Sequence, residues 1–326
     1  MLESILNPRE AANNLLEIFL VSSLFTTISI LTSYIMFPDC SSIVFCFFIT
    51  ILFGPFFQRL FAHEEIKEAL AIRHKIHENL FKRHEQVIKI YSAFFLGTII
   101  TLSIYTVLLP DNIKNVIFKK QYEEIERISR LVSGRFFEFE NIKFEGLDIQ
   151  NQFTAEKIEM AEMIFKNNSM VLFLSFLLSL IFGTGAILIL SWNASVIAAY
   201  VSGYVFALTR RGMDVLMAYA LGFPSALLAI TLHGIPEILG YFFAGLAGGI
   251  LSVGLIKERF GSKEMLIVVA DSFLLLGVGF FSIFVGAFIE TSEIIYGSIA
   301  FLSYILFLVI LFHKGEFKVE NKAEMK

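Results

Sequence analysis

Apolar residues gather into eight runs of about 20 residues, and charged residues collect between the runs. A helix of about 20 apolar residues crosses the roughly 30 Å hydrocarbon core of a bilayer, whereas the strands of a membrane barrel alternate apolar and polar residues. These runs do not alternate, so the pattern predicts an all-α polytopic membrane protein. The predicted spans are Leu15–Phe37, Ser41–Leu60, Ile90–Leu109, Met170–Leu190, Met213–Ile230, Ile238–Ile256, Met265–Phe288 and Ile295–Phe312.

The composition strengthens this prediction. Hydrophobic residues make up 56% of the chain, charged residues only 17%, and the mean hydropathy is +0.72, which is far from the values of soluble domains. The net charge of -4 is spread along the chain without a basic patch, so we expect no nucleic-acid partner. The two cysteines, Cys40 and Cys46, have the spacing of neither a zinc pair nor a disulfide framework.

The polar segments divide the chain into four parts. Residues 1–110 hold three spans and, between the second and the third, a predicted amphipathic helix over residues 62–89 on the cytoplasmic surface. Residues 111–168 form a predicted soluble insert. Residues 169–313 form the core membrane domain, and residues 314–326 form a cytoplasmic tail.

The insert at 111–168 is predicted to be a small extracytoplasmic α+β unit. A helix is expected from Ile113 to Val132, followed by a short stretch of alternating residues at 136–144 that is typical of a strand. Thr154 is a residue type that caps helices, so a second helix is expected to begin there and to run into the next span.

The basic loops predict the orientation in the membrane. Lysine and arginine concentrate in residues 59–89, at 210–211, in 257–263 and in the tail, and such loops are usually cytoplasmic. Both termini are then cytoplasmic in the cell membrane. Residues 169–208 can cross only once in this scheme, so residues 192–206 are predicted to form a re-entrant or interfacial helix.

Ionisable and amide residues interrupt the apolar runs. His233 and Glu237 lie in a Leu-His-Gly-Ile-Pro-Glu segment whose glycine and proline predict a break between two spans. Charged groups at membrane depth cost at least about 2.5 to 3.5 kcal/mol and are usually paired or functional. Asn168, Asn193 and Asp271 are candidate partners. Two interpretations remain open: a functional polar site, or a cluster that only holds the fold together.

Small residues recur every four positions in two runs, a spacing that lets membrane helices approach closely. We expect helix contacts at Ser175, Ser179 and Gly183, and at Gly240, Ala244, Gly248 and Ser252.

Four of the six histidines fall on one stripe of the predicted helix over residues 62–89. Solvated interfacial histidines are the simpler interpretation, and a metal-binding or pH-sensing seam is the alternative. The residues concerned are His63, His74, His77 and His84.

Enzymatic motifs are missing from the sequence. It has no His-Glu-x-x-His zinc motif, no nucleotide-binding loop, and no glycine at the position that an intramembrane serine protease requires before Ser202. We therefore expect neither an enzyme nor a cofactor.

The sequence resembles the stage II sporulation protein M family, in particular its archaeal-type branch. The resemblance rests on the segments Leu6–Ala11, Lys166–Asn168, Phe182–Ile187, Leu190–Val196, Leu232–Glu237, Ala244–Ser252 and Asp271–Glu290. The family's namesake is a multi-pass membrane protein that anchors a cell-wall-degrading complex without being the enzyme. The resemblance thus implies a non-enzymatic membrane scaffold that contacts membrane or extracytoplasmic proteins, or a second copy of itself. A transporter or channel with a polar site at His233 and Glu237 is the alternative.

Overall fold

The structure is a computed structural model that describes residues 11, 13–73, 79–128, 149–292 and 294–313. All secondary structure within these ranges is helical. The helices are α2 (Leu15–Met36), α3 (Ser41–Arg73), α4 (Leu80–Leu108), α5 (Asp111–Ile117), α7 (Ile149–Phe182), α8 (Ala186–Arg210), α9 (Val215–Lys257), α10 (Lys263–Thr291) and α11 (Ile294–His313), with a short 3-10 turn at Pro38–Cys40 and further helix at 119–128. Eight of the described helices are long and apolar enough to cross a membrane: α2, α3, α4, α7, α8, α9, α10 and α11.

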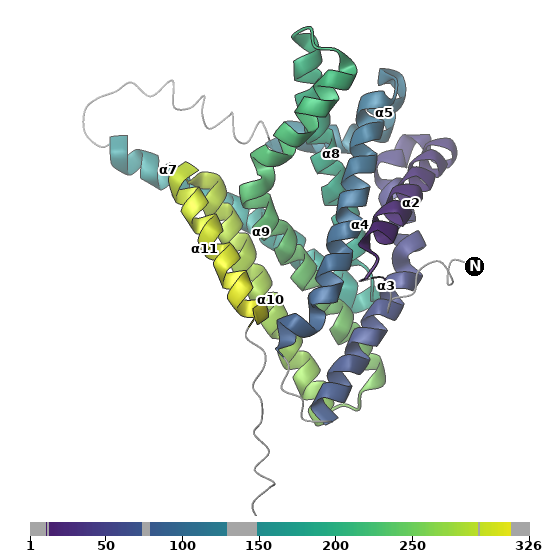
Figure 1. Cartoon of the computed structure of the whole chain (residues 1–326), viewed down its shortest axis with the longest axis vertical. Coiled ribbons are helices and arrows are strands. Elements are labelled where there is room, and N and C mark those ends of the chain that lie inside the picture. The colour runs from purple at the N-terminus through teal and green to yellow at the C-terminus, as the bar shows by residue number, and fades with distance from the viewer. Residues whose placement is uncertain (1–10, 12, 74–78, 129–148, 293, 314–326) are drawn as a thin grey trace, which may run out of the picture.

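Helix α9 is the centre of the bundle, with α10 and α11 on one side and α2, α3 and α4 on the other (Figure 1). Every residue from 241 to 252 is buried. This stretch is rich in glycine and alanine, and small residues allow several helices to contact one helix at once. The sequence of α9 therefore explains its central position.

The two small-residue runs contact each other. A β-carbon added at Gly248 in α9 would lie 2.8 Å from the Ser179 β-carbon in α7, and one added at Gly183 would lie 4.0 Å from the Ser252 hydroxyl oxygen. Ser179 also accepts a hydrogen bond from the backbone nitrogen of Ala186 at 2.9 Å, which fixes the turn between α7 and α8. Gly183 takes a positive φ of 75° in that turn, a conformation that glycine adopts at little cost.

Aromatic rings connect α3, α4 and α9. Tyr91 stacks on Phe57 and on Phe242, with ring centroids 5.1 and 5.2 Å apart. All three residues are buried, and such ring pairs contribute about 0.5–1.5 kcal/mol each beyond the area they bury. The first three spans and the helices around α9 thus share one apolar core.

The predicted break at His233 to Glu237 is wrong. Helix α9 is a single helix of 43 residues that contains both Pro224 and Pro236, about 65 Å long at 1.5 Å per residue. Membrane helices tolerate proline because neighbouring helices and hydroxyl side chains satisfy the freed backbone groups. The predicted spans 213–230 and 238–256 are therefore one element.

The predicted re-entrant segment 192–206 is not supported either. It lies inside α8, which has 25 residues and an apolar window of spanning length. The loop between α8 and α9 consequently lies at the opposite end of the bundle from the loop between α9 and α10 (Figure 1). The charge pattern had predicted that Arg210 and Arg211 lie on the same side as Lys257. The structure instead places them at opposite ends of α9.

The described part of the 111–168 insert is helical throughout, so its predicted α+β character is not supported. The alternating stretch at 136–144 falls outside the described residues. Thr154 lies within α7 and does not begin a helix. Gln121 attaches the helix at 119–128 to the bundle, because its amide nitrogen donates to the Ser42 carbonyl at 2.8 Å and to the Ser195 hydroxyl at 3.0 Å.

The predicted single helix over residues 62–89 is wrong as well. Its first part continues α3 as far as Arg73, and its last part begins α4 at Leu80. The two parts face each other, because the buried His84 ring nitrogen Nδ1 lies 2.9 Å from the buried Glu64 carboxylate. His63 lies in α3 and His84 in α4, so the predicted histidine stripe does not lie on one helix, and His74 and His77 lie outside the described residues.

Candidate functional site

A cavity of about 410 Å³ lies where α7, α8, α9 and α10 meet beneath the helix at 119–128. Its polar lining combines two carboxylates, one imidazole, three amides, two phenols and one guanidinium. These side chains are Glu237, Glu290, His233, Asn167, Asn168, Asn193, Tyr200, Tyr241 and Arg127. The apolar lining is Ile125, Ile128, Met160, Met163, Ile164, Val196, Ile197, Ile230 and Ile238.

A chain of hydrogen bonds leads from the protein core to Glu237. The Tyr241 hydroxyl donates to Asn168 Oδ1 at 3.0 Å, and the Asn168 side chain in turn hydrogen-bonds to the Glu237 carboxylate. Only the amide nitrogen of Asn168 can donate to a carboxylate, so both bonds require the same orientation of the amide. Tyr241 and Asn168 are buried, at 4% and 7% exposure, which fixes the position of Glu237.

One oxygen of Glu237 has no partner. Its Oε1 atom is buried and makes no hydrogen bond to any residue that the structure describes. A buried polar group without a partner costs about 1–3 kcal/mol, and more when it is charged. Oε1 itself packs against α10, where a β-carbon added at Gly286 would lie 3.2 Å from it.

Two other ionisable residues lie close to Glu237. Glu290, exposed at the end of α10, is near enough for the two carboxylates to repel each other, and it also interacts electrostatically with His233. Gly286 on α10 makes room for this arrangement, since a β-carbon there would lie 2.5 Å from Glu237 Cγ and 3.1 Å from the His233 carbonyl oxygen. The close contact of α9 with α10 thus places both carboxylates at one cavity.

The remaining polar groups leave acceptors facing the cavity. Asn193 donates its amide nitrogen to the Ile189 carbonyl at 2.8 Å, so its Oδ1 is the atom available to a ligand. Arg127 is engaged by Glu124, with nitrogen-oxygen distances of 2.5 and 2.9 Å. Hydrogen bonding to Glu124 raises the pKa of Arg127, and the pair has no net charge. The cavity is therefore acidic in character.

Four of the five polar residues singled out in the sequence line this cavity: Asn168, Asn193, His233 and Glu237. The fifth, Asp271, does not. Its carboxylate lies 3.6 Å from Arg83, in an ion pair between α10 and α4. The sequence analysis did not single out the other five polar lining residues, which are Arg127, Asn167, Tyr200, Tyr241 and Glu290. In the sequence Glu290 stands at the end of an apolar run, at a position typical of a loop residue.

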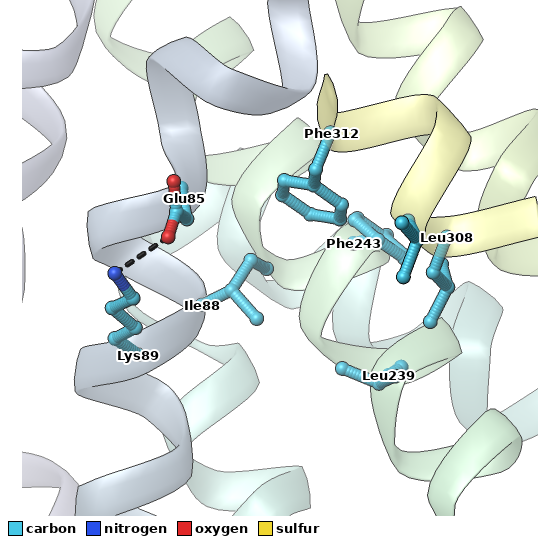
Figure 2. Close-up of a pocket in the computed structure, with 8 residues that line it drawn as sticks. Glu85, Ile88, Lys89, Leu239, Phe243, Leu308 and Phe312 are labelled. Carbon is cyan, nitrogen blue, oxygen red and sulfur yellow. Dashed lines mark ion pairs between the residues drawn. The ribbon is translucent and has the colours of Figure 1, made fainter. Parts of the chain in front are cut away.

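The second cavity differs in kind. It measures about 460 Å³ and lies between α4, α9 and α11. Figure 2 shows Phe243, Leu308 and Phe312 around it, with Glu85 and Lys89 at one edge. Lys89 Nζ and Glu85 Oε1 form an ion pair at 2.5 Å, so neither charge at the edge of this cavity lacks a partner. This groove is an apolar surface suited to lipid chains, and the first cavity is the candidate site.

Metal binding finds no support in the described residues, because no three histidine, cysteine, aspartate or glutamate side chains converge there. His84 is engaged with Glu64, and His63 also has an interaction partner. The cavity itself offers carboxylate and amide oxygens with one imidazole.

Comparison with known proteins gives one match. The family model of stage II sporulation protein M covers residues 18–292, which includes every helix that lines the cavity. No curated protein and no solved structure matches the chain. A family match over this length, together with eight spanning helices, makes the chain a multi-pass membrane protein that belongs to the stage II sporulation protein M family.

Proposed function

We propose that the protein is a non-enzymatic transporter that binds a small polar solute in the cavity around Glu237 and moves it across the membrane. The convergence of Glu237, Glu290 and His233 on one cavity carries this proposal. A structural carboxylate at membrane depth would have all its acceptor sites satisfied by the protein, because an unsatisfied one destabilises the fold. Three ionisable side chains gathered at one cavity are better explained by a ligand.

The packing around the cavity supports access from one end. The helix at 119–128 forms its outer wall, and Gln121 fixes that helix at the beginning of α3. Toward the other end, residues 241–252 of α9 are buried without interruption. This arrangement suits a carrier in a state that is open to one side only, and passage requires the helices around α9 to rearrange.

The orientation that we propose has both termini in the cytoplasm and residues 111–148 outside the cell membrane. With eight crossings, the basic segments 59–89 and 257–263 lie on the cytoplasmic side, as the positive-inside rule expects. Of the short basic loops, only the one with Arg210 and Arg211 lies outside. In this orientation the cavity in the described structure opens to the exterior.

A cysteine introduced at Ile230 tests the proposal. In a Cys40→Ala background, in which the remaining Cys46 is buried, Ile230→Cys is expected to react with a membrane-impermeant thiol reagent from outside intact cells. A transporter also visits the opposite state, so inside-out vesicles are expected to be labelled too. The control is Leu274→Cys, an exposed residue of α10 outside the cavity lining.

Two results would contradict the proposal. Absence of labelling from either side means that the cavity does not admit water-soluble molecules. Labelling from one side only, under all conditions, would mean that the protein binds a solute and does not transport it.

A scaffold is the second candidate, because the α8–α9 hairpin extends beyond its neighbours. Ser202 in α8 hydrogen-bonds to the Thr106 carbonyl at 3.4 Å, two residues before α4 ends. Helix α8 then continues for eight residues, about 12 Å. The hairpin exposes Leu216 and Leu228, which are 78% and 71% accessible. Apolar surface that projects from a bundle is suited to contact a second membrane protein.

Affinity purification under mild detergent separates the two candidates. The scaffold predicts a stoichiometric partner that is lost in a Leu216→Ser, Leu228→Ser variant and retained in a Leu274→Ser variant. Recovery of both variants with the same companions as the wild type would rule out a partner at the hairpin.

A further inference from the structure

The charges at the cavity select for a cation. Glu237 and Glu290 both line it, and the only guanidinium in the lining is already neutralised by Glu124. His233 is the one remaining group in the lining that can carry a positive charge, so ionisation of both carboxylates gives the cavity an excess of negative charge. Anions would meet repulsion here in a medium of low dielectric constant, where charge interactions are strongest.

The free polar atoms select for a hydrogen-bond donor. The carboxylates of Glu237 and Glu290 and the amide oxygen of Asn193 are acceptors in the lining, whereas the Tyr241 hydroxyl and the Asn193 amide nitrogen donate within the protein. An ammonium group has three N–H donors and no acceptor. It matches what the cavity leaves open, both in charge and in hydrogen bonding.

The size and walls of the cavity select for an organic cation. A volume of about 410 Å³ far exceeds that of one water molecule, about 30 Å³, and no described cluster of ligands encloses a bare ion. Isoleucine and methionine side chains make up most of the apolar lining, among them Ile164, Ile197 and Ile230. Such a wall stabilises a short hydrocarbon chain.

We infer that the cavity binds a small organic cation with a primary ammonium group on a short aliphatic chain, the ammonium group at Glu237 and the chain against the isoleucines. The inference rests on the proposed function of the cavity as a solute site. Glu290, which is exposed at the same cavity, adds attraction for the approaching cation.

Thermal unfolding of the purified full-length protein in detergent tests this inference. Butylammonium chloride is expected to raise the unfolding temperature in a saturable way, because a ligand that binds only the folded state stabilises it. Sodium butyrate and sodium chloride at equal ionic strength are expected to have no such effect. In Glu237→Gln the apparent affinity for butylammonium is expected to fall by at least about 30-fold, the lower end for a buried charge pair that loses one partner.

The control variant is Glu85→Gln, which removes an exposed carboxylate outside this cavity, and its affinity is expected to equal that of the wild type. If Glu237→Gln does not fold, Ile230→Phe replaces it, because a larger side chain fills the cavity and is also expected to weaken binding.

The outcomes separate the inference from the proposed function. Stabilisation by butyrate or by sodium alone that depends on Glu237 overturns the organic cation and keeps a solute site. Stabilisation by butylammonium that is unchanged in both Glu237→Gln and Ile230→Phe shows binding elsewhere and overturns the inference. A failure of labelling at Ile230→Cys removes the solute site itself.

Discussion

Uptake is expected to be abolished in a Glu237→Gln variant that folds at least as stably as the wild type. Glutamine keeps the size of the side chain and can still accept the hydrogen bond from Asn168, but it removes the charge. It also replaces the buried, unpartnered carboxylate oxygen by part of a neutral amide, which costs less to bury than a charged group. A functional residue is expected to behave in this way, because its replacement lowers activity and leaves stability equal or higher.

The measurement combines two assays on the same preparation. Uptake of radiolabelled 1,4-diaminobutane into proteoliposomes reports transport, since the two charges of this amine slow its leakage through lipid. The unfolding temperature in detergent reports stability. Uptake is expected to fall to the level of empty liposomes, while the unfolding temperature stays equal or rises.

Asp271→Asn provides the matched control, because it is the same chemical change in another spanning helix. Asp271 is paired with Arg83 at 3.6 Å and lies outside the cavity lining, so its loss is expected to lower the unfolding temperature and to spare uptake. Parallel loss of uptake and stability in Glu237→Gln would instead show that Glu237 holds the fold together.

The sequence predicted much of the site because the physical cost of polar groups in hydrocarbon is independent of the fold. Asn168, Asn193, His233 and Glu237 stood out for that cost alone, and the structure places all four at one cavity. Asp271 stood out in the same way. However, the neighbour that a side chain faces depends on how far its helix is rotated about its own axis. Residue type does not encode that rotation, so Asp271 could not be assigned to Arg83 beforehand.

The number of spanning helices was predicted correctly through two errors that offset each other. Helix α9 was divided at Gly234 and Pro236, and helix α8 was not counted as a span. Helix α8 was not counted because the basic residues at 210–211 and at 257–263 were assigned to the same side of the membrane, whereas the division of α9 has another origin. Proline and glycine end helices in water, whereas the bundle supplies α9 with neighbours along its length, and local rules applied to a single segment do not include those neighbours.

A substitution at the centre of the bundle tests whether close helix packing, and not composition alone, specifies the fold. Gly248→Ala is expected to destabilise the protein by about 1–3 kcal/mol, the usual cost of forcing extra volume into a packed interior. The added β-carbon would collide with the Phe176 carbonyl oxygen, and would lie 2.8 Å from Ser179 Cβ and 3.0 Å from the Leu180 backbone nitrogen. Two of these three atoms belong to the backbone of α7, which cannot turn away as a side chain could.

The control is Gly234→Ala in the same helix, because nothing lies within 4 Å of a β-carbon added there. Alanine favours a helix over glycine by up to about 1 kcal/mol, so this variant is expected to be as stable as the wild type or more so. Thermal unfolding of both variants in the same detergent gives the comparison. Equal stability would mean that α7 and α9 can separate at no cost. The small-residue runs would then not be what holds α9 at the centre of the bundle, where it carries Glu237 to the cavity.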